Sequence, residues 1–361
     1  MPFDVRDFTG ALPEDRASSR QNRRLVGAWL LTVAGMILVM VALGGATRLT
    51  GSGLSIMEWA PFRGTLPPMN EAEWLRLFDL YKQIPQYALV NDGFGLAGFK
   101  HIFWLEWTHR LWGRLIGLVL LVPLVFFWAT GRIERRLIYR LGLLFMLGGL
   151  QGAVGWFMVA SGFFANSTAV SAYRLVVHLV LALVLYSAVL WTALSVLTPR
   201  PAFPPAPRVL RTLIQATTVM IGITIVAGGF VAGIHAGLDY NTFPLMAGKL
   251  VPDGYGALHP FLRNLTENIA AVQFDHRILA TVTATLALAT LVIGATVPAG
   301  VRLRPRLIAL GLTVVAQYVL GVMTLLLVVP VDVATAHQVG ATLLLTASLV
   351  LLHAVRATRV R

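Results

Sequence analysis

The stretch LVGAWLLTVAGMILVMVALGGA, residues Leu25–Ala46, contains no charged side chain. A helix of about 20 apolar residues crosses the roughly 30 Å hydrocarbon core of a bilayer, so this stretch has the length of one membrane span. The whole chain has the same character, because 57% of its 361 residues are hydrophobic and only 12% are charged. Soluble domains are normally about 25% charged. The sequence is therefore that of an integral membrane protein.

Apolar stretches of this length recur along the chain and predict an all-α fold with eight transmembrane helices. The polar segment Met1–Arg24 precedes the first of them and lacks the early apolar region of a secretory signal. Cysteine is absent, which excludes disulfides, zinc–thiolate sites, iron–sulfur clusters and thiol nucleophiles. The predicted helices lie near Leu25–Ala46, Trp107–Trp128, Leu141–Ala160, Tyr173–Leu197, Leu213–Ile234, Phe274–Ile293, Leu307–Val329 and Val333–Val355.

The basic residues are distributed unevenly between the two faces of the membrane. With eight spans, one face receives both termini and 18 of the Lys and Arg residues, whereas the other face receives 7. Lys and Arg accumulate in cytoplasmic loops, so both termini are predicted to be cytoplasmic. The net charge of +13 is then a signal of orientation and gives no indication of nucleic-acid binding.

The two halves of the chain resemble each other. A shift of 184 residues places Gly44-Gly45 on Gly228-Gly229, and each half has four helices with a long first outer loop. An even number of spans separates the halves, so they face the same way. We therefore predict a parallel internal repeat of two four-helix bundles. The predicted segments are an N-terminal tail 1–24, a first bundle 25–198, a Pro-rich cytoplasmic linker 199–210 and a second bundle 211–361.

Four histidines lie at one depth. Each stands within the first turns at the outer end of the second, fourth, sixth or eighth predicted helix. Polar groups inside membrane spans are costly and usually functional. Two neutral imidazoles that face each other across a bundle suit heme iron, whereas zinc would need at least a third ligand. The four histidines are His109, His178, His276 and His337.

For other polar residues near the outer helix ends, the sequence allows more than one role. Arginines at these positions can bind heme propionates through charge-assisted hydrogen bonds, or lipid headgroups. The candidates are Arg48, Arg110, Arg114, Arg174 and Arg277. The remaining histidines are interpreted as structural or solvated, and they are His101, His235, His259 and His353.

Glu106 makes the two halves different. It precedes His109 by three residues, so a helix places both side chains on one face. The matching position before His276 is occupied by Gln273. A carboxylate can accept a proton or stabilise positive charge, which predicts one reactive heme site and one permanent heme site. The alternative is that Glu106 only marks the membrane boundary.

The motifs along the membrane region form a specific ordered set. They begin with GGATRLTGSGLS and continue to the last of the four histidines. The set comprises Gly44–Ser55, Glu58-Trp59, Phe99-Lys100, Glu106–Arg110, Gly113-Arg114 and the histidines at 178, 276 and 337. With these motifs the sequence resembles the heme A synthase family, and without cysteine it resembles the cysteine-free branch.

The resemblance implies a reaction and a set of ligands. Heme O, supplied by a protoheme farnesyltransferase, would be oxidised at its C8 methyl group to a formyl group, giving heme A for terminal oxidases. His109 and His178 would hold the substrate heme beside a catalytic Glu106, and His276 and His337 would hold a resident heme B. The implied location is the bacterial inner membrane, with the heme sites toward the periplasmic face. An electron partner, oxidase assembly factors and a homo-oligomer are further expectations.

Two questions stay open from the sequence. A pair of histidine ligands leaves no free iron position, so either a histidine detaches for dioxygen or electrons leave through the heme and water supplies the oxygen. Two other kinds of protein also fit the four histidines. One is a di-heme membrane electron carrier, which leaves Glu106 and the long first loop unexplained, and the other is a heme-delivery protein without chemistry.

Overall fold

The computed structural model describes residues 13–60, 63–165, 167–199, 206–298 and 300–356. Within these ranges, eight helices are long and apolar enough to cross a membrane, which confirms the prediction from the sequence. They are α1 (Pro13–Leu49), α4 (Leu96–Ala129), α5 (Arg135–Ala160), α6 (Ala172–Leu197), α7 (Arg208–Gly233), α9 (Ile269–Thr296), α10 (Gly300–Leu326) and α11 (Val331–Ala354).

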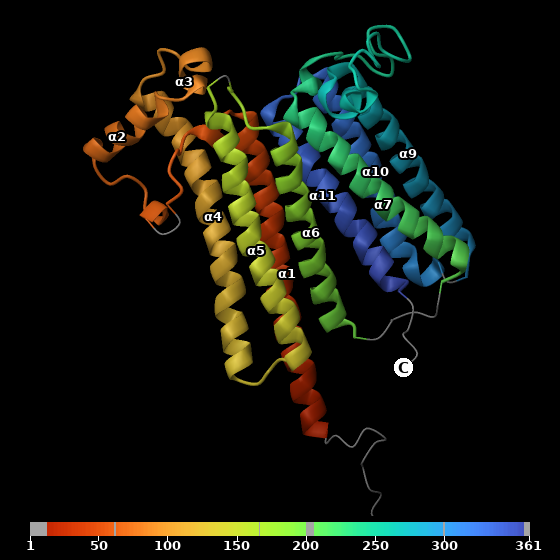
Figure 1. Cartoon of the computed structure of the whole chain (residues 1–361). Helices are drawn as coiled ribbons and strands as arrows, with labels where there is room; N and C mark the ends of the chain where they lie inside the picture. The colour runs from red at the N-terminus through yellow and green to blue at the C-terminus, as the bar shows by residue number, and fades with distance from the viewer. Residues whose placement is uncertain (1–12, 61–62, 166, 200–205, 299, 357–361) are drawn as a thin grey trace, which may run out of the picture.

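The long helices form two neighbouring groups (Figure 1). Helix α1 packs against α4 and α6 in the first group, and α9 packs against α7 and α10 in the second. The groups meet where α1 contacts α11 and where α6 contacts α7. A single cluster of buried apolar side chains includes residues from both groups, so the two groups pack against each other through a common core. The start of α1 and the end of α11 lie at one end of the molecule, and both long loops lie at the other (Figure 1).

Two helices begin more than ten residues before their predicted apolar stretches. Helix α4 starts at Leu96, ahead of the predicted Trp107, because its first turns are covered by the loop before it. Helix α1 starts at Pro13, so part of the predicted tail continues the first helix. Residues 1–12 of that tail, 200–205 of the predicted linker and 357–361 at the C-terminus lie outside the described residues.

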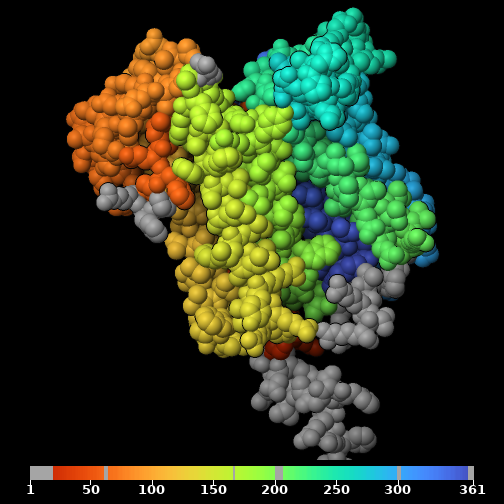
Figure 2. All heavy atoms as spheres, viewed as in Figure 1, coloured from red at the N-terminus to blue at the C-terminus, as the bar shows by residue number. Residues whose placement is uncertain are grey.

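The first outer loop folds into a small helical cap, residues 70–95, on the start of α4. It contains α2 (Glu71–Tyr81) and α3 (Pro85–Val90), and the Asn70 side chain accepts a hydrogen bond from the backbone N–H of Glu73 (2.9 Å) at the start of α2. Trp74 packs edge-on against Phe103 of α4 at 4.8 Å between ring centroids. The cap therefore has its own apolar cluster, and it projects beside the outer ends of α4 and α5 (Figure 2).

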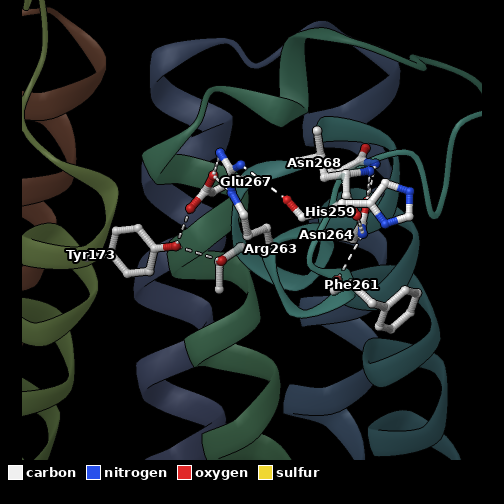
Figure 3. Close-up of polar contacts among 9 residues, drawn as sticks. Tyr173, His259, Phe261, Arg263, Asn264, Glu267 and Asn268 are labelled. Atoms are coloured by element: carbon white, nitrogen blue, oxygen red, sulfur yellow. Dashed lines mark hydrogen bonds and ion pairs between the residues drawn. The ribbon is translucent and has the colours of Figure 1, made fainter.

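The second outer loop is shorter and is held by polar contacts. It includes η5 (Phe261–Arg263) and α8 (Asn264–Glu267). Tyr173, at the start of α6, donates a hydrogen bond to Glu267 at 2.8 Å, and Arg263 pairs with the same carboxylate at 2.6 Å (Figure 3). This contact links the two groups of helices at their outer ends.

Candidate functional site

The four predicted histidines come together as two pairs. His109 of α4 lies near His178 of α6. His276 of α9 lies near His337 of α11. Each pair therefore joins the second and fourth long helices of its own group. Among the described residues, no group of three or more His, Asp or Glu side chains is placed to hold a metal ion.

Each of these imidazoles lies against a glycine of a neighbouring helix. A Cβ atom at any of the four glycines would stand 2.8–3.2 Å from a ring atom, closer than real Cβ contacts normally come. The rings can occupy these positions only because no side chain stands there. The contacts are His109 with Gly44 of α1, His178 with Gly155 of α5, His276 with Gly228 of α7 and His337 with Gly321 of α10.

These glycines were not predicted as part of the site, although the sequence contains two signals for them. Gly44 and Gly228 already coincide in the internal alignment. Gly155 and Gly321 each follow a glutamine by four residues, in QGAVG and QYVLG. The four-residue spacing places each of these two glycines on the same helix face as its glutamine.

Glu106 is buried, with 2% of its surface exposed, and its carboxylate has partners on both oxygens. One oxygen accepts hydrogen bonds from the Ser55 hydroxyl (2.7 Å) and the Ile56 backbone N–H (2.9 Å). The other accepts from Nε (3.0 Å) and Nη2 (2.7 Å) of Arg110. Arg110 also donates to the carbonyls of Ile56 (2.6 Å) and Glu58 (2.8 Å). Together these bonds fasten the segment Ser55–Glu58 to α4.

The second group has the same arrangement with reversed hydrogen-bond polarity. Gln273 donates to the carbonyls of Ala236 and Asp239, both at 2.6 Å, and accepts from Arg277 at 2.7 Å. Arg277 also donates to the carbonyls of Tyr240 and Thr242. In the first group the loop presents donors, whereas here it presents acceptors. The carboxylate of Glu106 and the amide of Gln273 are therefore each complementary to the hydrogen-bonding groups of their own loop.

The other arginines predicted at the helix ends have different surroundings. Arg114 donates to the carbonyl of Ala60 (2.9 Å), and Arg174 donates to the carbonyl of Phe157 (2.7 Å) while covering its ring at 3.8 Å. Nη2 of Arg48 is buried and has no hydrogen-bond partner among the described residues. Such a group calls for an acceptor. A heme carboxylate would satisfy it, so the residues here fit a heme.

The remaining histidines lie apart from the two pairs. His101 and His259 are exposed, and burial together with the charge of Arg48 lowers the pKa of His235. His353 is buried near the opposite end of the molecule, where it packs edge-on against Trp191 at 5.0 Å. None of these four histidines belongs to either of the two pairs.

Comparison with known proteins agrees with this geometry. Residues 27–349 match the COX15-CtaA family, described as a cytochrome oxidase assembly protein family. The chain is 66% identical over 337 residues to the heme A synthase of Granulibacter bethesdensis, covering 93% of this chain and 89% of that protein. The chain belongs to the heme A synthase family. This confirms the resemblance predicted from the motifs.

Other family members are similarly close. The heme A synthase of Rhodospirillum centenum is 51% identical over 327 residues, covering 91% of this chain and 87% of that protein. Heme A synthase 2 of Acidiphilium cryptum is 47% identical over 343 residues, covering 94% and 93%. The matched range, residues 27–349, spans the positions of Glu106 and all four paired histidines.

Proposed function

We propose that the chain is a heme A synthase, an enzyme that oxidises the C8 methyl group of heme O to a formyl group through a hydroxymethyl intermediate. Membership of the family supports the activity. The observation that carries the site assignment is the two histidine pairs, each buttressed by glycines, of which one lies beside a buried carboxylate. The product heme A is then passed to terminal oxidases with the help of assembly factors.

In this proposal the first group of helices holds the substrate. His109 and His178 bind the iron of heme O, and Glu106 lies one helical turn before His109 on α4. The carboxylate is fully engaged by donors, so it acts most directly as a fixed negative charge that stabilises positive charge on the substrate. Accepting a proton would require one of its present hydrogen bonds to break.

The second group holds the resident cofactor in this proposal. A heme B bound there supplies one-electron redox chemistry. His276 and His337 would hold its iron, and Gln273 gives this site no negative charge. Arg48 and Arg277 each keep a buried guanidinium nitrogen without a partner among the described residues, which suits propionate groups.

The proposed architecture and location follow from the same contacts. Arg110 and Arg277 bind loop carbonyls at positions that differ by the 184-residue shift, which supports a parallel duplication. The membrane face with most of the Lys and Arg residues is predicted to be cytoplasmic and to hold both termini. Both heme sites are then predicted to lie toward the periplasmic side of a bacterial inner membrane. Delivery of heme O from a farnesyltransferase, exchange with an electron partner and homo-oligomer formation are parts of the proposal.

Heme extraction tests the proposed function. The full chain is produced in cells that make heme O, and the extracted hemes are identified by mass. Heme A, or heme O hydroxylated at the C8 methyl group, is the expected result. Unmodified heme B alone, reducible by quinol, would show an electron carrier instead. Bound heme O that is never converted would show a delivery protein.

A further inference from the structure

The third long helix of each group carries a glutamine that contacts the histidine of the fourth. Nε2 of Gln317 lies 3.1 Å from Nδ1 of His337. Nε2 of Gln151 lies 3.1 Å from Nδ1 and 3.3 Å from Nε2 of His178, and it donates to the carbonyl of the same histidine at 3.1 Å. The glycine that supports each ring follows its glutamine by four residues. One helical turn therefore presents both an amide and a bare backbone to the same imidazole.

Neither glutamine is explained by packing alone. A side-chain amide inside a membrane span is costly unless it is hydrogen-bonded. The Oε1 atoms of both Gln151 and Gln317 are buried and have no hydrogen-bond partner among the described residues. The same unusual feature thus occurs at matching places in the two groups.

The chemistry of a metal-bound histidine accounts for an amide at this place. An imidazole that binds iron through Nε2 carries its proton on Nδ1, and in proteins this N–H is normally bonded to an acceptor. The two ends of an amide differ only by a half-turn of the terminal torsion. Gln317 can therefore present its free oxygen to the Nδ1–H of His337, whereas the amide nitrogen of Gln151 is already committed to the carbonyl of His178.

The contact is more tightly enclosed in the second group. A Cβ at Gly340 of α11 would lie 2.3 Å from Oε1 of Gln317, so this glycine makes room for the amide. Gly321 of α10 makes room for His337 in the same way. At the position of Gly340 the first group has Leu181, counted from its own histidine. Each of the helices α10 and α11 thus has a glycine opposite a polar side chain of the other.

We propose that Gln317 is a positioning residue that orients His337 on the iron of the resident heme. This inference rests on the proposed function, because it needs heme at the pair formed by His276 and His337. It predicts that the glutamine fixes the plane and the basicity of the histidine ring without touching the heme.

Spectroscopy of the full-length protein in detergent tests the proposal. The Gln317→Leu variant should retain heme B about 10- to 100-fold less tightly, the scale found when a partner of a metal ligand is lost. The heme that remains should show changed low-spin electron paramagnetic resonance g-values, because the ring is free to turn. Gln317→Glu restores an acceptor, so it should restore retention and lower the heme midpoint potential. Gln215→Leu, at an exposed glutamine of α7, is the matched control and should behave as wild type.

The outcomes separate this proposal from the proposed function. Wild-type protein without heme B would overturn the proposed function and this inference with it. Heme-loaded wild type together with unchanged retention and g-values in Gln317→Leu would overturn the positioning role alone. If Gln317→Leu does not give a monodisperse protein, Gln317→Glu decides the question. Wild-type g-values and potential in that variant would refute the contact with His337.

Discussion

Glu106→Gln is the most informative single substitution, because the structure shows what the carboxylate holds. Glutamine keeps the size of the side chain but offers one acceptor oxygen where the carboxylate offers two. If that oxygen faces Arg110, as Gln273 faces Arg277, the amide N–H groups point toward the hydroxyl of Ser55 and the N–H of Ile56. The hydroxyl can rotate to accept, whereas the backbone N–H cannot. The attachment of the segment Ser55–Glu58 to α4 is therefore weakened.

The expected size of the effect follows from these bonds. Removing one partner of a buried ion pair costs about 3–5 kcal/mol. At about 1.4 kcal/mol for each factor of ten, the equilibrium that holds this segment on α4 weakens by roughly 10²-fold to several 10³-fold. Loss of a charge used in the reaction would add a factor of about 10² or more. Conversion of heme O to heme A should therefore fall at least about 10²-fold, and heme O should accumulate.

A second substitution separates the two contributions. Ser55→Ala removes one donor but leaves the charge of Glu106, at a cost of about 1.5–3 kcal/mol. The assay measures heme O, hydroxylated heme O and heme A by mass, together with protease sensitivity of the first outer loop. Heme B content should stay at the wild-type level in both variants, because His276 and His337 are unchanged. Conversion in Glu106→Gln at the wild-type rate would refute both roles. Equal losses in the two variants, with equal protease sensitivity, would leave Glu106 a positioning role only.

Three further outcomes are expected. His276→Ala should abolish the spectrum of resident heme B, since it removes an iron ligand; full heme B content would contradict the assignment. Gly228→Ala should displace the His276 ring and lower heme B content about tenfold or more, whereas Gly222→Ala in the same helix, with open space at its Cβ, should not. Reporter fusions after Arg361 should score cytoplasmic and one near Gly254 periplasmic; any other pattern would overturn the proposed orientation.

The sequence alone determined the spans and the depth of the histidines. Both depend on local properties, since the length of an apolar run and the register along one helix need no knowledge of distant residues. It also singled out Glu106, because its spacing from His109 lies within one helical turn. It missed the start of α4 at Leu96, where the first turns of the helix are covered by α2 and α3. The hydropathy of a segment does not indicate whether another part of the chain packs over it.

Only the tertiary structure decided how the site is held. The donors to Glu106 come from Ser55 and Ile56, about 50 residues earlier in the chain, and the glycines that admit the rings stand on other helices. The amide of Gln317 reaches His337 only because α10 and α11 pack against each other. These contacts join residues that are distant along the chain, so no local pattern specifies them. The sequence thus determined which side chains enter the membrane, whereas helix packing decided which of them meet.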